Sequence, residues 1–268
     1  MKFEHGMLAQ IPFAAHGSGP PLVVLAGLLP VTGVGSSVLI QSATDPVHHL
    51  LGTRRFIVLN RRPGLAPDLT MSALASEHAH ALRAGFDGPV DVLGSSTGGS
   101  IAQQLAADHP DTVRRLCLVS SACRLGPHAK SSQAQLARDL HEHRYRHAVA
   151  TASKALTPPR AGQHLAAGIG WVTAPRILTS PEQAADLAAT LHAEDGFDLA
   201  TCHDQIQAPT LIIAGARDRF YNQELFAETT QLIPNSHLRI FPHRGHITIA
   251  LDHTARTEIA HFFTQHQT

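Results

Sequence analysis

The residues best suited to catalysis form the turn Gly94-Ser95-Ser96-Thr97-Gly98. It matches the pattern G-x-S-x-G, follows an apolar run and opens a helix-length segment, which is the context in which this pattern exposes a serine. Small residues two before and two after the serine let the chain bend sharply. The first N–H groups of the following helix can stabilise an oxyanion there. We therefore expect Ser96 to be a nucleophile. A plain glycine-rich turn is the alternative, and Ser95 is out of register with the flanking glycines.

A serine hydroxyl is a weak nucleophile and needs a base that is oriented by an acid. When the serine occupies such a strand-to-helix turn, the acid and then the histidine follow later in the chain. Asp218 is the first carboxylate after the apolar run 210–214, whereas no carboxylate directly follows the run 115–119. His246 comes after the last apolar run, and the glycine before it lets the loop turn the ring inward. We favour His246 as the base, with His243 as a nearby competitor.

These groups must be positioned by short apolar runs that alternate with helix-length segments. The runs are rich in β-branched residues and lie at 22–26, 55–60, 89–93, 115–119, 210–214 and 238–241. Continuous apolar runs favour parallel strands that are covered on both faces. Helices are expected at 70–86, 97–109 and 252–263, so the pattern predicts an α/β chain with a doubly wound parallel sheet. Residues 3–15 predict an antiparallel hairpin at its edge.

The alternation stops between residues 123 and 205, where no convincing strand appears. Residues 133–156 predict a helix. Ser180, followed by a proline and then by a glutamine at the capping-box position, predicts the start of another. We expect a core made of residues 1–122 and 206–268, with 123–205 inserted as a helical cap or lid. Insertions at strand ends usually cover or shape a site.

The chain resembles the α/β-hydrolase superfamily over nearly its whole length, on the segments 94–99, 209–218 and Gly245-His246. The resemblance implies the α/β-hydrolase fold, with a mostly parallel eight-stranded sheet flanked by helices and a helical cap inserted after strand six. It implies that Ser96 is the nucleophile, that His246 is the general base and then acid, and that Asp218 orients it. The resemblance also implies an oxyanion hole formed by the backbone N–H groups of Thr97 and Leu28. Many relatives carry His-Gly just before the second donor, where this chain has Ala26-Gly27.

Single residues narrow the chemistry within the superfamily. Serine in place of aspartate at the turn argues against the haloalkane dehalogenase and epoxide hydrolase relatives. Thr97 and Ile247 stand where proline iminopeptidases and carbon–carbon bond hydrolases often carry tryptophan. We expect a serine hydrolase that cleaves a small or medium carboxylic ester, thioester or lactone through an acyl-serine, without a cofactor. The alternatives are a cofactor-free perhydrolase or haloperoxidase-like enzyme and a non-hydrolytic ligand-binding relative.

Three residues are candidates for binding the substrate. Leu29 lies in the apolar segment 28–40, which could form an entrance or simply belong to the core. Arg61 and Arg62 follow the run 55–60 and could bind a substrate carboxylate. The alternative for this pair is a solvated loop.

The composition excludes several classes of function. The chain has 268 residues, with 21 basic and 21 acidic ones, so it has no overall positive field to hold nucleic acid or an anionic membrane. The uncharged stretch 22–40 is long enough to span a membrane, but glycines and a proline interrupt it, so we expect a strand followed by a loop. The first residues lack the apolar run of a signal peptide, and the three cysteines show no C-x-x-C spacing. We expect a cytoplasmic protein whose partner is a small acyl substrate, with a homodimer left open.

The twenty histidines raise the question of a metal site. The densest cluster is His141 to His147, in which His143 and His147 would share one face of the expected helix. A divalent ion would need further ligands, and neighbouring arginines oppose a cation there. We expect no metal. The histidines other than His246 are expected to form a titrating surface that makes the chain cationic below about pH 6.5.

Overall fold

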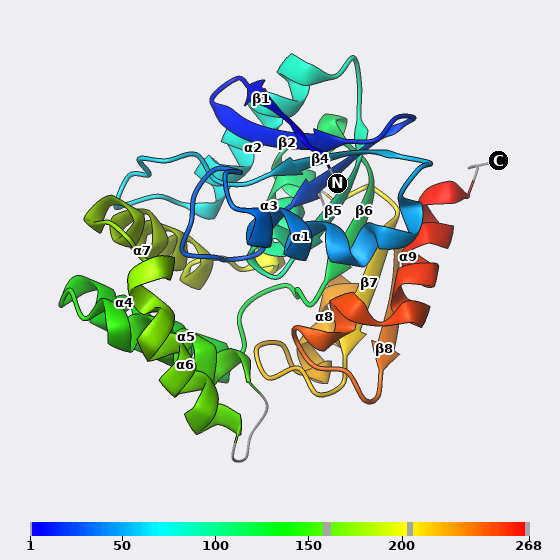
Figure 1. Cartoon of the computed structure of the whole chain (residues 1–268). Helices are drawn as coiled ribbons and strands as arrows, with labels where there is room; N and C mark the ends of the chain where they lie inside the picture. The colour runs from blue at the N-terminus through cyan, green and yellow to red at the C-terminus, as the bar shows by residue number, and fades with distance from the viewer. Residues whose placement is uncertain (1, 158–161, 203–205, 266–268) are drawn as a thin grey trace.

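The computed structural model describes residues 2–157, 162–202 and 206–265. Eight strands form one sheet in the order β1-β2-β4-β3-β5-β6-β7-β8 (Figure 1). Within this described sheet only β2 runs against the other strands, and it joins β1 in the expected edge hairpin. The predicted fold class is therefore confirmed. The strands are β1 (Glu4–Leu8), β2 (Ile11–His16), β3 (Pro21–Leu25), β4 (Arg55–Leu59), β5 (Val90–Ser95), β6 (Val113–Val119), β7 (Thr210–Gly215) and β8 (Ser236–Phe241).

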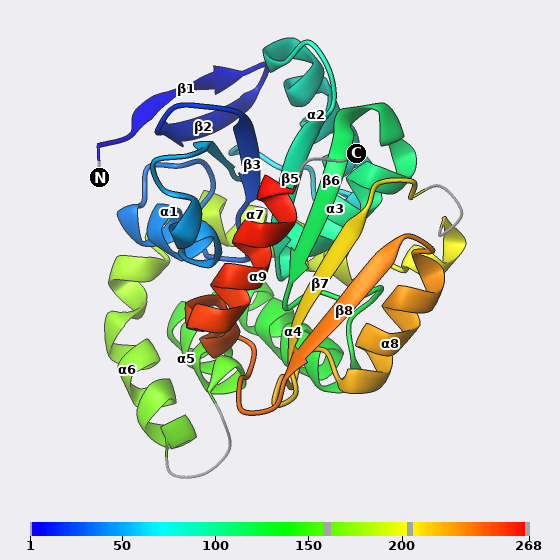
Figure 2. The same cartoon turned by 90° about the vertical axis from the view of Figure 1, so that its right-hand side faces the viewer.

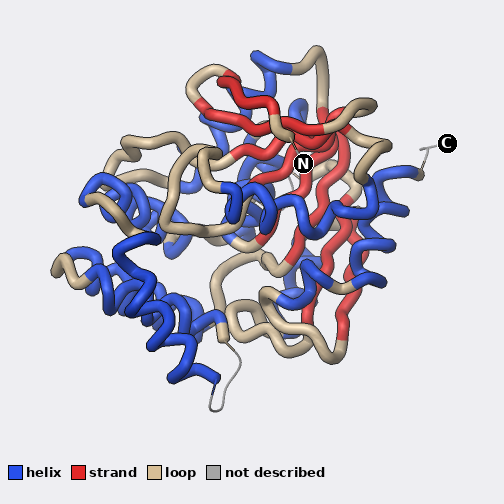
Figure 3. Tube along the Cα trace, in the orientation of Figure 1, coloured by secondary structure: helices blue, strands red, loops and turns tan. Residues whose placement is uncertain are grey.

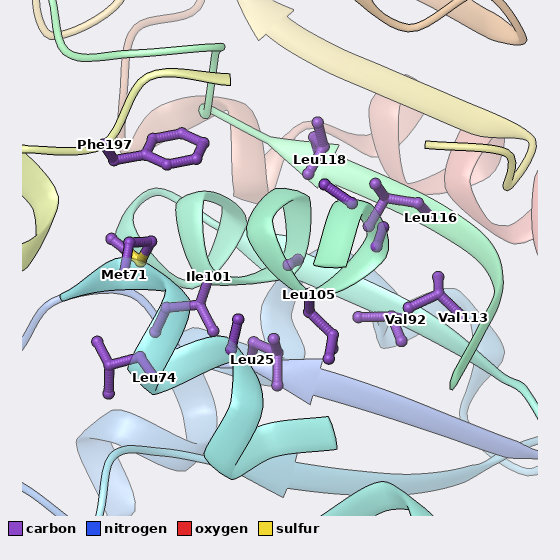
Figure 4. Close-up of a cluster of buried hydrophobic side chains, with 14 of the residues drawn as sticks. Leu25, Met71, Leu74, Val92, Ile101, Leu105, Val113, Leu116, Leu118 and Phe197 are labelled. Atoms are coloured by element: carbon purple, nitrogen blue, oxygen red, sulfur yellow. The ribbon is translucent and has the colours of Figure 1, made fainter. Parts of the chain in front are cut away.

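Helices cover both faces of the sheet because its central strands are apolar on both sides. Along β3, Val23 and Leu25 pack into one buried cluster, while Leu22 and Val24 pack into another on the opposite face. The first cluster includes residues of α2, α3 and α8, and Figure 4 shows part of it. The second cluster includes residues of α1 and of α9, which crosses in front of the sheet in Figure 2. These helices are α1 (Ser37–Thr44), α2 (Met71–Gly85), α3 (Thr97–Asp108), α8 (Gln223–Leu232) and α9 (His253–Thr264). Short 3₁₀ turns are η1 (Asp45–Leu50), η2 (Pro110–Thr112), η3 (Leu199–Thr201) and η5 (Thr248–Leu251).

Four helices, here called the inserted helices, lie between β6 and β7. They are α4 (Pro127–His141), α5 (Tyr145–Leu156), α6 (Gly162–Ile177) and α7 (Pro181–Asp195). They gather beside the sheet in Figures 1 and 3 and share a separate apolar cluster that includes Leu136, Val149 and Leu187. Ser180 begins α7 as predicted, because its hydroxyl accepts a hydrogen bond from the N–H of Gln183 at 3.3 Å. The expected end of the insertion at residue 205 lies outside the described residues.

The single helix expected over 133–156 is wrong, since the chain turns between α4 and α5. His143 has a φ of 56°, a left-handed conformation that ends a helix. Arg144 then binds back to Asp139, both through its backbone N–H at 2.7 Å and through its guanidinium at 2.8 Å. His143 and His147 therefore do not share one helix face. In the described part of the chain, no three His, Cys, Asp or Glu side chains gather as a metal site.

Two further expectations need correction. The loop expected up to residue 40 ends earlier, because Ser36 caps α1 by accepting a hydrogen bond from the N–H of Leu39 at 3.3 Å. His78 is not a surface histidine, since it is 1% exposed and its Nδ1 lies 2.7 Å from the carbonyl oxygen of Leu74. Burial lowers the pKa of His78. None of the helices in the described ranges combines the length and apolar character needed to cross a bilayer.

Candidate active site

Ser96 sits on a strained turn between β5 and α3. Its φ of 51° and ψ of −125° are unusual for a residue with a side chain. The turn is possible because of its glycines. A Cβ on Gly98 would overlap the carbonyl oxygens of Leu25 and Ala26, and a Cβ on Gly94 would lie 2.7 Å from the Cα of Gly99. Since backbone atoms cannot move aside easily, both glycines are needed to hold Ser96 in this conformation.

The structure brings together Ser96, His246 and Asp218, the residues expected to be the nucleophile, the base and the orienting acid. The Oγ of Ser96 lies 3.0 Å from Nε2 of His246, and Nδ1 of the same ring lies 2.8 Å from Oδ2 of Asp218. The side chains of His246 and Asp218 are 6% and 0% exposed. An ionised carboxylate only accepts hydrogen bonds, so Nδ1 carries the proton and Nε2 is free to accept from the serine. The arrangement can deprotonate Ser96 as it attacks a carbonyl carbon.

Asp218 is held by the backbone that follows it. Its Oδ1 accepts hydrogen bonds from the N–H groups of Phe220 at 2.8 Å and Tyr221 at 3.2 Å, which leaves Oδ2 for the histidine. The rings of Phe220 and Tyr221 stack on the His246 ring, with centroids 4.8 and 5.9 Å away. They thereby restrict the orientation of the imidazole. Sequence reasoning missed both residues, although an aromatic pair that begins two residues after the expected acid was a usable signal.

The loop that carries His246 is anchored to the end of β6. The hydroxyl of Ser120 donates a hydrogen bond to the carbonyl oxygen of His246 at 2.8 Å. The competing candidate, His243, is exposed, and its Nδ1 lies 3.3 Å from Nη2 of Arg217. Of the two histidines, His246 is the one placed against Ser96.

Both expected oxyanion donors lie beside the serine. Thr97 is the first residue of α3, where backbone N–H groups have no partner within the helix. Leu28 follows β3 and lines the same pocket as Ser96, as does Leu29. A Cβ on Gly27 would lie 3.2 Å from the carbonyl oxygen of Ser95, so the loop that carries Leu28 packs closely on the turn that carries Ser96.

Arg61 and Arg62 are not among the described residues that line this pocket. Arg61 is 3% exposed and donates hydrogen bonds to the carbonyl oxygens of Leu29 at 2.9 Å and Val31 at 3.1 Å. Burial lowers the pKa of Arg61 to about 10. Arg62 pairs with Glu77 at 2.8 Å. Arg61 therefore supports the loop that carries Leu28 and Leu29, at a distance from any substrate in the pocket.

The pocket around Ser96 has a volume of about 260 Å³ and mostly apolar walls. Its apolar lining comes from the core and from the inserted helices: Leu28, Leu29, Val119, Leu125, Leu136, Ala152, Ala155, Leu156, Phe220, Ile247, Ala250 and Leu251. Residues from distant parts of the sequence thus enclose one space, which could hold the acyl part of a substrate.

A buried carboxyl group, Glu194, also lines the pocket and was missed by sequence reasoning. It belongs to the last turn of α7 and is 1% exposed. One of its oxygens accepts hydrogen bonds from Thr97 Oγ1 and Gln133 Nε2, both at 2.9 Å. The other accepts from Ser100 Oγ at 3.3 Å and the Tyr221 hydroxyl at 3.4 Å. Burial raises the pKa of Glu194, although these hydrogen bonds oppose the shift.

The sequence and the fold of the chain are similar to those of known proteins. The model of the alpha/beta hydrolase family matches residues 14–260. A pimeloyl-[acyl-carrier protein] methyl ester esterase of Nitrosomonas europaea is 26% identical over 243 residues, covering 89% of this chain and 93% of that protein. The enzyme of the same name from Neisseria meningitidis serogroup C is 55% identical over 47 residues. That match spans only 18% of this chain and 18% of the Neisseria protein.

A solved structure shows the same fold. The enol-lactonase from Burkholderia xenovorans LB400 superposes with a TM-score of 0.75 at 19% sequence identity, covering 98% of this chain and all of that one. The family match begins within β2, ends within α9, and includes Ser96, Asp218 and His246. The chain belongs to the alpha/beta hydrolase family.

Proposed function

We propose that the chain is a serine hydrolase that cleaves a carboxylic ester through an acyl-serine intermediate. The observation that carries the proposal is the continuous hydrogen-bonded relay from Asp218 through His246 to the strained Ser96. Membership in a hydrolase family supports it. Perhydrolysis and simple ligand binding use the same scaffold, so turnover of esters is what separates this proposal from them.

The proposed reaction has two halves. In the first, Ser96 attacks the ester carbonyl while His246 accepts its proton, and the N–H groups of Thr97 and Leu28 stabilise the oxyanion. His246 then donates that proton to the leaving alcohol, which departs and leaves an acyl-serine. In the second half, His246 deprotonates a water molecule that attacks the acyl carbon, and the proton returns to Ser96 as the acid is released.

We propose an uncharged leaving group and a mainly apolar acyl chain, because the pocket walls are mostly apolar. We also propose that the inserted helices act as a cap, since Leu136, Ala152 and Leu156 line the same pocket as Ser96. Methyl esters are the first substrates to test, because two similar proteins are named as methyl ester esterases.

The test is steady-state hydrolysis of methyl and p-nitrophenyl esters of increasing chain length, together with lactones. We expect turnover in the wild type, loss of at least ~10³-fold in Ser96→Ala, and no loss in the exposed control Ser76→Ala. Equal rates for all chain lengths would contradict the apolar acyl pocket. Peroxide-dependent halogenation without ester hydrolysis would favour a perhydrolase instead.

A further inference from the structure

We propose that Glu194 is a specificity-determining residue that restricts the enzyme to esters whose acyl group carries no carboxylate. The proposal rests on the proposed function, because it concerns the acyl part of the same pocket. It follows from three features: the charges around the pocket, the way Glu194 is fixed there, and the hydrogen-bonding groups left for a substrate.

The pocket has acidic side chains and no cationic side chain that could pair with a substrate carboxylate. Among the described lining residues there is no lysine or arginine, whereas Asp45 and Glu194 are both present. Asp45 forms an ion pair with Arg256 at 3.5 Å, and Arg256 is not one of the described residues that line the pocket. Arg61 is not among the described lining residues: its Nη2 donates to two backbone carbonyl oxygens, its Nη1 has no partner in the described part of the chain, and its charge already interacts with Glu194. A carboxylate entering this space would lose its hydration and would find no lysine or arginine among the described lining residues to pair with.

The carboxyl group of Glu194 cannot easily turn away from the pocket. Donors from three different elements fix its two oxygens: Thr97 and Ser100 on α3, Gln133 on α4 and Tyr221 after β7. Thr97 is the residue next to the nucleophile, so this acid lies close to where the acyl group must bind. All four of these groups donate to Glu194, as they would to an ionised carboxylate, which only accepts hydrogen bonds, so a second carboxylate bound nearby would be repelled.

The remaining hydrogen-bonding capacity also disfavours an anion. The Nε2 of Gln133 donates to Glu194, and its Oε1 is buried with no partner in the described part of the chain. Gln133 lines the pocket, so this unpaired, buried acceptor lies in or directly behind the pocket wall. A hydroxyl or amide N–H of a substrate can satisfy it, whereas a carboxylate oxygen cannot. The acyl groups that fit are therefore apolar or carry a neutral hydrogen-bond donor.

The experiment compares two substrates of almost equal shape. One is the monomethyl ester of a dicarboxylic acid, with its other end ionised; the other is the same monomethyl ester with that end converted to a primary amide. The kcat/KM values are measured at pH 8 for C4 and C7 chains. Like charges about 6 Å apart, at an effective dielectric constant near 20, change a rate constant by ~100-fold. We expect the wild type to prefer the amide at least ~30-fold for one or both chain lengths.

Three variants assign this preference to Glu194. Glu194→Gln keeps the shape, and the hydroxyls around it can rotate to accept from the new amide, so we expect a folded protein whose preference falls at least ~10-fold. Glu194→Asp keeps the charge and should keep the preference, whatever its absolute rate. Glu182→Gln makes the same change at an exposed position of the same helix and should behave as the wild type. Thermal unfolding checks the fold of each variant.

If the wild type prefers the amide to the carboxylate by less than threefold at both chain lengths, that result alone overturns the proposal. So would an unchanged preference in folded Glu194→Gln. These outcomes differ from failure of the proposed function, in which neither ester is hydrolysed faster by the wild type than by Ser96→Ala.

Discussion

Replacing Asp218 with asparagine tests how the acid controls His246. The side chain keeps its shape, and Oδ1 can still accept the N–H groups of Phe220 and Tyr221, which lie 2.8 and 3.2 Å from it. The NH₂ group then occupies the position 2.8 Å from Nδ1 of His246, where it donates a hydrogen bond. His246 must accept there and carry its proton on Nε2, 3.0 Å from Ser96, so it can no longer act as the base.

The expected loss in kcat is ~10⁴-fold, which corresponds to about 5.5 kcal/mol of transition-state stabilisation. The assay is ester hydrolysis at saturating substrate, with circular dichroism and thermal unfolding to check the fold. Asp68→Asn, at an exposed loop position, is the matched control and should show wild-type turnover. A folded Asp218→Asn protein with kcat within tenfold of the wild type would refute the reasoning, since the orienting acid would then have to be another residue.

Two predictions concern the fold around the site. Gly98→Ala should cost at least ~2 kcal/mol of the free energy of unfolding, because its Cβ would overlap two backbone carbonyl oxygens, whereas Gly88→Ala has open space and should cost little. Chemical denaturation measures both, and equal stabilities would contradict the close approach. Burial lowers the pKa of His78, so its contribution to stability is present above pH ~6.5, the unfolded value, and is lost as the pH falls. His78→Gln should reduce the pH dependence of stability between pH 7 and 5 by up to ~1.4 kcal/mol per pH unit, whereas exposed His80→Gln should not; identical slopes would contradict it.

The sheet could be predicted from the sequence because its signals are local. Each parallel strand is a short apolar run, as in residues 210–214, and the nucleophile turn carries its glycines at fixed positions around Ser96. Helix starts were also readable where one side chain caps the first turn, as Ser180 does for α7. Asp218 and His246 were predicted from their places after the last two apolar runs and from the order serine, acid, histidine along the chain.

The features that sequence reasoning missed depend on contacts between distant residues. Glu194 has no local pattern, and its place beside Thr97 results from the packing of α7 against α3. The roles expected for Arg61 and Arg62 followed from their place after a strand, but sequence alone does not show that Arg61 turns to the carbonyl groups of a neighbouring loop. The turn at His143 interrupts a segment whose residues are otherwise good helix formers, so propensity gave no sign of it.

The most direct test of the central claim is to label the chain with a fluorophosphonate, which reacts with activated serines, and to locate the adduct by peptide mass mapping. We predict one adduct per chain at Ser96, with ester hydrolysis lost in proportion to labelling. We also predict no adduct in Ser96→Ala and greatly slowed labelling in Asp218→Asn. Labelling at another serine, or labelling that persists in Ser96→Ala, would contradict the proposal that Ser96 is the nucleophile.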